Sequence, residues 1–161
     1  MPILHTQFSG QAQDPSGQTI QIPPAIALVQ RGPCVQAAVT IAQSMGAQLV
    51  QQGQTLPQPV AGLALIDTGA TSTCIDEDTA QRLGLPVIDV VSVASASHAS
   101  TQQNVYPVTL HIAGLPIPIN VPRAVGAPLD AQGLLLLIGR DVLRFCTLFY
   151  NGLTGEITLS I

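Results

Sequence analysis

The chain has 161 residues, of which 47% are hydrophobic, 9% are charged and 3% are aromatic. This length suits a single domain with a core of Val, Ile, Leu and Ala, a composition that favours strands over long helices. The five basic residues, all Arg, are scattered and outnumbered by nine acidic residues, which excludes a phosphate-binding surface and with it nucleic-acid partners.

Apolar runs are short throughout the sequence. Even Leu134–Ile138, which is wholly apolar, is far below the roughly 20 residues that a membrane-spanning helix needs. The first ten residues, M-P-I-L-H-T-Q-F-S-G, lack the basic and apolar regions of a secretory signal. We therefore expect a cytoplasmic protein without a membrane partner.

The cysteines are three in number and widely spaced, at Cys34, Cys74 and Cys146, without a C-x-x-C pair. This spacing argues against both a disulfide framework and a thiolate zinc site. The three histidines are equally dispersed. We predict reduced cysteines that serve mainly in packing, no metal site and no cofactor.

The N-terminal residues 1–20 contain Gly, Ser, Gln and an Asp-Pro pair and show little periodic hydrophobicity. They are expected to form a tail or arm, and residues 21–161 to form the folded domain. Within it, A-I-A-L-V-Q and C-V-Q-A-A-V-T-I predict a hairpin that turns at Arg31-Gly32-Pro33. The Gln-rich residues 47–59 are predicted as a surface loop or short hairpin, because their two prolines disfavour a helix.

An apolar strand, L-A-L-I, is then predicted to end at Asp67, where T-G turns the chain. The next segment, I-D-E-D-T-A-Q-R-L-G-L-P, predicts a helix of about two turns. Asp76 is expected to cap this helix and Gly84 to end it.

The second half of the chain is expected to be mainly β. The pattern predicts strands at residues 87–94, 105–112, 116–122 and 134–138, a short helix within 140–145, and a closing hairpin with Asn151-Gly152 near its turn. The strand at 134–138 is expected to be buried on both faces, and His111 to face solvent. G-L-A-L-I-D-T-G (62–69) resembles G-L-L-L-L-I-G-R (133–140), which suggests a weak internal duplication.

Asp67 has three interpretations. It could simply start a turn by accepting hydrogen bonds from backbone N–H groups two residues on. Asp67, Gly69, Thr71 and Thr73 also resemble the first phosphate loop of the actin and sugar-kinase superfamily. That fold needs two domains that clamp ATP, for which this chain has no room.

The third interpretation depends on a longer pattern. L-A-L-I-D-T-G-A-T-S-T-C-I, followed about 70 positions later by L-L-L-L-I-G-R-D-V-L, resembles the retroviral-type aspartic proteases (retropepsins) and their bacterial relatives, over residues 21–161. The resemblance implies an all-β, retropepsin-like acid protease fold, the closed, orthogonal β-barrel-like half of an aspartic protease, with one or two short helices.

The same resemblance implies a homodimeric aspartic endopeptidase. Peptide hydrolysis without a metal or covalent nucleophile needs a base and an acid, and two carboxylates about 3 Å apart can share these roles because only one ionises readily. This chain has one D-T-G, and Ile138-Gly139 stands where a second Asp would be needed. A second copy of the chain must therefore supply the other Asp67, and the substrate is a peptide or protein.

Roles for neighbouring residues follow from the resemblance. Thr68 would hydrogen-bond across the dimer axis, Gly69 would leave room for the substrate backbone, and Ala70 would line the site. Arg140 and Asp141 would brace the active-site loop from behind, although Arg140 could instead be a surface residue of its helix.

The segment 92–104 would be the flap that closes over a bound peptide. Its tip would consist of Ser95, Ala96, Ser97 and His98. Two features depart from the family pattern. Thr71 stands where retroviral members usually have the Asp that pairs with the arginine of G-R-D, and no glycine occurs between Gly84 and Gly114, although flaps are commonly Gly-rich. A catalytically silent retropepsin-fold module for dimerisation or peptide binding is therefore the alternative.

Overall fold

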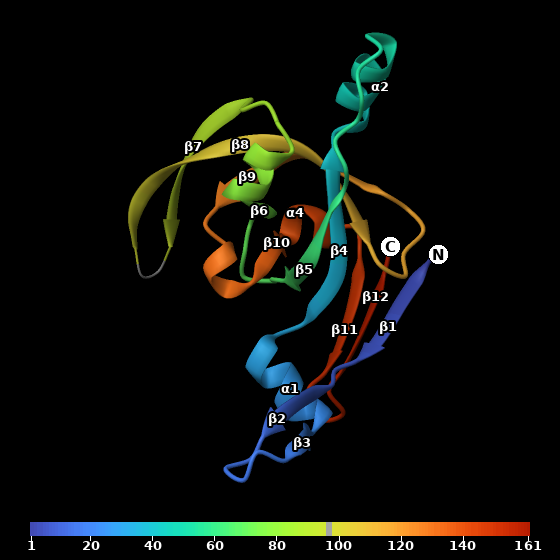
Figure 1. The fold of residues 1–161 in the computed structure, drawn as a ribbon, viewed down its shortest axis with the longest axis vertical. Coiled ribbons are helices and arrows are strands. Elements are labelled where there is room, and N and C mark those ends of the chain that lie inside the picture. Colours follow the sequence, from blue (N-terminus) through green and yellow to red (C-terminus); the bar gives the residue numbers. More distant parts are fainter. Residues whose placement is uncertain (96–97) are drawn as a thin grey trace.

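The computed structural model describes residues 1–95 and 98–161 and consists mainly of strands (Figure 1). The strands are β1 (Ile3–Gln7), β2 (Gly10–Gln13), β3 (Thr19–Ile22), β4 (Cys34–Ile41), β5 (Val60–Ile66), β6 (Cys74–Asp76), β7 (Asp89–Ser95), β8 (His98–Ile112), β9 (Ile119–Ala127), β10 (Leu134–Ile138), β11 (Thr147–Asn151) and β12 (Glu156–Ser160). The helices are α1 (Pro24–Arg31), α2 (Gln43–Gln51), α3 (Glu77–Arg82), α4 (Arg140–Leu143) and the 3-10 helix η1 (Asp130–Gln132).

The main sheet closes into a barrel. Among the described residues its strand order is β4-β5-β10-β6-β9-β8-β7, and β4 also pairs with β8. This second pairing joins the two sides of the sheet, so that only β7 lies outside the ring. Every strand of the ring therefore pairs on both sides, which confirms the prediction of an all-β, barrel-like fold.

The core of the barrel is aliphatic, as the composition predicts. Ile75, Leu110, Leu136 and Ile138 are all fully buried. Tyr106 is the aromatic exception, at 2% exposure. Leu135 and Leu136 are adjacent and both buried, which agrees with the prediction that this strand is covered on both faces.

A second, three-stranded sheet brings the two ends of the chain together. Its order is β1-β12-β11, and β11 and β12 form the predicted C-terminal hairpin. β1 lies within the segment expected to be a tail or arm, and it pairs with β12 from Ile3 opposite Ser160 to Gln7 opposite Glu156. The two ends of the chain lie side by side (Figure 1).

The prediction of a hairpin at Arg31-Gly32-Pro33 is wrong in its first half. The residues before this turn form the helix α1, although β4 follows it as expected. Pro24 occupies the first helical position, where its fixed φ favours a helix. Gly32 ends the helix at φ +70° and donates to the Leu28 carbonyl. Buried Ala27 and Leu28 then anchor α1 to the rest of the protein.

The predicted loop at residues 47–59 is also partly wrong, because α2 extends into it. Gln, Ala, Leu and Met are good helix formers, and Pro57 lies beyond the helix, which ends before Gly53 at φ +69°. No residue of α2 is buried, and the helix stands away from the barrel (Figure 1).

The other predicted helix boundaries are confirmed. The Asp76 carboxylate accepts a hydrogen bond from the Thr79 backbone N–H and caps α3. Gly84 follows the helix at φ +63°. In the part of the chain that the structure describes, no helix is long and apolar enough to cross a membrane.

Candidate active site

Asp67 lies directly after β5, at one end of the barrel. It is half-buried, and its Oδ1 accepts hydrogen bonds from the backbone N–H groups of Gly69 at 2.8 Å and Ala70 at 3.2 Å. The turn interpretation of this residue is therefore correct as local geometry, and it fixes the direction of the carboxylate.

The two similar segments of the sequence are neighbours in space. β5 and β10 pair in parallel, with Ile66 opposite Ile138, so both strands end at the same edge of the sheet. The Asp67 N–H donates to the Ile138 carbonyl at 3.0 Å, and the Arg140 N–H donates to the Ala70 carbonyl at 3.0 Å. Asp67 and Gly139 therefore begin two facing turns, and only the first turn has a carboxylate at its first position. Asp141 lies two residues after Gly139, and its Oδ1 is already bound by Thr73.

The side chain of Arg140 lies along the turn that follows Asp67. Its Nη1 donates to the carbonyls of Thr68 at 3.0 Å and Gly69 at 3.3 Å, and its Nη2 donates to Thr71 Oγ1 at 2.8 Å. Thr71 thus accepts from the arginine at the position where retroviral members usually have Asp.

Asp141 binds the other side of the same turn through Thr73. Its Oδ1 accepts from the Thr73 N–H at 2.9 Å and from the Thr73 hydroxyl at 2.8 Å, while the Gly139 N–H donates to Thr73 Oγ1 at 3.1 Å. Thr73 is fully buried. The sequence interpretation included Thr73 only in the phosphate-loop pattern and missed this contact, since its partners lie 68 and 66 positions away.

Gly139 is required by its close contact with the facing turn. A Cβ at this position would lie 2.5 Å from the Ser72 carbonyl carbon and 2.8 Å from the Thr73 nitrogen. Both are backbone atoms, which cannot move aside as a flexible side chain would. The two turns can therefore approach this closely only because one of them begins with glycine.

A cleft of about 1230 Å³ lies in front of these turns. Asp67 and Ala70 line it from one side, Val91 and Val93 of β7 from another, and Val121 and Arg123 of β9 from a third. The walls supplied by β7 and β9 are largely aliphatic. This composition suits an extended apolar chain better than a charged nucleotide.

Cys74 also lines the cleft, and sequence reasoning assigned it only to packing. Burial raises the pKa of its thiol to about 11, and the negative charges of Asp141 and Asp67 add to the shift. The thiol is therefore protonated at neutral pH and is not a nucleophile. Cys34, Cys74 and Cys146 are all free and half-buried.

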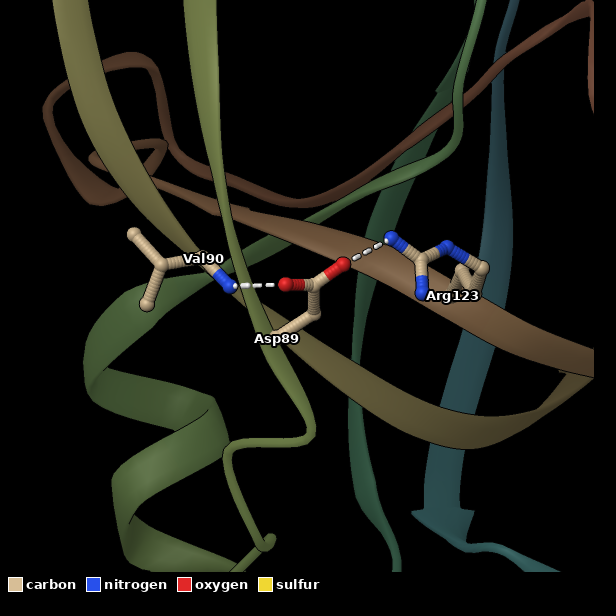
Figure 2. A network of polar contacts seen from close by, with 3 residues as sticks. All are labelled: Asp89, Val90 and Arg123. Carbon is tan, nitrogen blue, oxygen red and sulfur yellow. Dashed lines mark hydrogen bonds and ion pairs between the residues drawn. The ribbon is translucent and has the colours of Figure 1, made fainter.

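The predicted flap corresponds to the hairpin β7–β8. Ser95 and His98 are opposite each other at the ends of the two strands, whereas Ala96 and Ser97 lie outside the described residues. At the base of this hairpin, Asp89 Oδ2 accepts from Arg123 Nη2 at 2.5 Å and Oδ1 accepts from the Val90 N–H at 2.8 Å (Figure 2). These contacts, with Arg123 the larger cause, lower the pKa of the Asp89 carboxyl.

Arg144, which follows α4, also lines the cleft, whereas His111 does not. His111 is exposed on β8 and hydrogen-bonds Thr40 Oγ1 at 3.2 Å, so the prediction of a solvent-facing strand residue is confirmed. Among the described residues, no group of three or more His, Cys, Asp or Glu side chains is arranged to hold a metal ion.

Comparison with known proteins identifies a family pattern in the part of the chain that forms this site. The family model for the gag-polyprotein putative aspartyl protease matches residues 59–144, which run from the start of β5 through α4. No curated protein matches the sequence.

Several solved structures are similar to the chain, including the three that follow. The Simian Foamy Virus (mac) protease is 19% identical, with 70% of this chain and 92% of that chain covered and a TM-score of 0.43. A retropepsin-like aspartic protease from Rickettsia conorii is 12% identical, with 99% and 94% covered and a TM-score of 0.43. The retroviral protease-like domain of Ddi1 from Leishmania major is 21% identical, with 73% and 80% covered and a TM-score of 0.39.

Proposed function

Since the chain belongs to the family of gag-polyprotein aspartyl proteases, we propose that it is an aspartic endopeptidase that acts as a homodimer. The observation that carries this proposal is the asymmetry of the two facing turns. Asp67 begins one turn, Gly139 begins the other, and the cleft in front of them is lined by a single D-T-G carboxylate. The chemistry needs two such carboxylates, so a second protomer supplies the other.

The reaction uses the two Asp67 carboxyl groups in different protonation states. When two carboxylates lie about 3 Å apart, repulsion keeps one of them protonated. The ionised group takes a proton from water as the water oxygen attacks the peptide carbonyl carbon, and the protonated group gives its proton to the carbonyl oxygen. Proton transfer to the amide nitrogen then allows the C–N bond to break, which releases a carboxylic acid and an amine.

The local geometry supports this use of Asp67. Its Oδ1 already accepts two backbone hydrogen bonds, and among the described residues no donor binds Oδ2. The bound oxygen fixes the orientation of the carboxylate, while Oδ2 is left for water or for the other carboxyl group. Such fixed orientation lowers the cost of reaching the reactive geometry.

The residues around Asp67 have supporting roles in this proposal. Thr68 is exposed and hydrogen-bonds across the dimer axis, Gly69 leaves room for the substrate backbone, and Ala70 lines the site. Arg140 and Asp141 brace the turn through the contacts described above. The β7–β8 hairpin, whose paired residues end at Ser95 and His98, closes over the peptide and excludes water.

The decisive experiment combines Asp67→Asn with mixing of protomers. Cleavage of an unfolded protein between pH 3 and 7 is expected to fall by about a thousandfold or more in Asp67→Asn, because both acid and base functions are lost. A tenfold excess of this variant over wild type should lower wild-type activity by roughly tenfold, because most wild-type protomers then pair with an inactive one.

Asp78→Asn provides the matched control, because Asp78 is exposed on α3 and does not line the cleft. An excess of this variant should leave wild-type activity intact. Cleavage that survives Asp67→Asn would contradict the catalytic assignment, and activity that is insensitive to mixing would contradict the shared site. Peptide binding without turnover at every pH would instead indicate the silent binding module.

A further inference from the structure

The wall of the cleft formed by β9 contains a cation, Arg123. Its side chain is 55% exposed, and Nη2 donates to Asp89 Oδ2. A guanidinium carries five N–H donors in a rigid plane. Among the described residues, Asp89 is the only side chain that accepts from Arg123, so further donors remain for a molecule in the cleft.

A β-bulge sets the direction of this side chain. In the pairing of β8 with β9, Tyr106 lies opposite Ala124 and Val108 lies opposite Val121, with a register shift between them. Pro122 and Arg123 therefore face the single residue Pro107. Bulges of this kind redirect a side chain and are frequent beside active sites. Here the consecutive residues Val121, Pro122 and Arg123 all line the cleft. In a regular strand, successive side chains point to opposite faces, so three consecutive residues would not all line one cleft.

Aliphatic side chains make up much of the cleft lining around Arg123, together with the polar residues Ser92 and Asn120, and Arg144 is a second cation in the lining. Val91, Val105, Val121 and Val125 line the same cleft, and the last three are between 1% and 8% exposed. A cation beside such a wall is less well screened by water than one on an open surface. Asp89 holds the guanidinium in place (Figure 2) without being part of the cleft lining itself.

We propose that Arg123 determines specificity by binding the carboxylate side chain of an Asp or Glu residue in an extended peptide substrate. This inference rests on the proposed peptide hydrolysis at Asp67. A carboxylate matches the geometry of two parallel guanidinium N–H groups. The substrate class is thus a mainly apolar peptide with one acidic residue at a fixed distance from the cleaved bond.

The test compares peptides that carry Glu, Gln or Lys at each position around the cleaved bond. Wild type is expected to prefer Glu over Gln by about tenfold in kcat/KM at one position, since hydrogen bonds to charged groups have this strength. Arg123→Gln should remove the preference at that position. Arg82→Glu is the matched charge control, because Arg82 is exposed on α3 and does not line the cleft, and it should keep the preference.

The double variant Asp89→Arg/Arg123→Glu separates recognition from structure. It preserves an ion pair at the base of the β7–β8 hairpin while it reverses the charge that lines the cleft, and thermal unfolding checks that its fold is retained. We expect this variant to prefer Lys over Glu at the same position. If it still prefers Glu, or if wild type shows no preference for Glu at any position, the inference is wrong.

A binding measurement makes the inference independent of catalysis. Fluorescence anisotropy with the Asp67→Asn protein compares the affinities of the Glu and Gln peptides without turnover. A tighter Glu complex that Arg123→Gln abolishes supports the inference even if the wild-type protein cleaves nothing. Equal affinities contradict it even if the wild-type protein is an active protease.

Discussion

The two sides of the cleft are built very differently. The floor consists of the turn after Asp67 together with the facing turn at Gly139. Hydrogen bonds that Arg140 donates and that Asp141 accepts cross between the two turns. The β7–β8 hairpin, which is the proposed flap, is held by one strand ladder because β7 pairs only with β8 among the described residues. Its Val90 and Val93 are 51% and 39% exposed.

The floor of the cleft is therefore held more firmly than the hairpin opposite it. In the proposed dimer, a carboxylate that meets another within about 3 Å has to be held firmly, and hydrogen bonds of Arg140 and Asp141 hold the turn after Asp67 in the floor. The proposed hydrolysis also requires a peptide to enter and leave, so the opposite side needs a low free energy of opening. Segments with few buried contacts open first, and the flap fits this description.

The largest expected effect comes from breaking the floor with Gly139→Ala. The new Cβ would meet the backbone of Ser72 and Thr73 at 2.5 to 2.8 Å, so one turn must move away from the other. We expect the free energy of unfolding to fall by about 3 kcal/mol or more. Urea unfolding at one fixed protein concentration measures this change, because the stability of the proposed dimer would depend on protein concentration.

Gly46→Ala is the control for that substitution. Gly46 lies within α2, and a Cβ there would meet Ile41 at an ordinary 3.7 Å. Alanine is the better helix former, so the free energy of unfolding should rise by up to about 1 kcal/mol. If both variants lost the same free energy of unfolding, the close contact between the two turns of the floor would not contribute to stability.

A smaller effect is expected from Asp141→Ala, which removes the shared acceptor behind the floor. The Thr73 N–H and hydroxyl would lose their partner while Thr73 stays buried. Leaving such groups unsatisfied costs about 2 to 3 kcal/mol. Asp141→Asn retains an oxygen acceptor and should cost about 1 kcal/mol. If both variants unfold at the same urea concentration as wild type, Asp141 does not brace the turn.

Local signals explain which parts of this architecture could be predicted. The α3 helix has its cap at Asp76 and its stop at Gly84 within a few residues, and β10 is a continuous apolar run. The sequence did not predict α1, because Ile26, Leu28 and Val29 favour a strand. In the structure, Pro24 at the start of the segment and the burial of one helix face stabilise a helix instead. The closure of β4 onto β8 joins residues about 70 positions apart, and no local pattern encodes it.

The same distinction holds for the candidate site. Two sequence motifs, which can be recognised by their order along the chain, contain Asp67 in the first and Arg140 and Asp141 in the second. Thr73 and the pair of Asp89 with Arg123 depend on partners 68 and 34 positions away. Their residue types are ordinary, so they become visible only when the strands that carry them are placed side by side.

The smallest expected effect concerns the flap and depends on pH. Because Arg123 lowers the pKa of Asp89 in the folded protein, their contact stabilises the base of the flap above the ordinary carboxyl pKa of 3.8. This stabilisation is lost as the pH falls through the lowered value. Both side chains are substantially exposed, so the effect should be modest.

Hydrogen exchange can isolate this contact from the rest of the protein. At pH 6, Asp89→Asn should lower the protection factors of the β7 and β8 amides relative to wild type and leave those of β5 and β10 unchanged. As the pH is lowered below 3.8 and through the lowered pKa of Asp89, the difference between wild type and variant should shrink, because protonation of Asp89 removes its charge. Asp78→Asn should match wild type in the flap at both pH values. A change spread equally over the floor and the flap would instead mean that the two sides of the cleft open together, and the contrast between them would not describe the protein in solution.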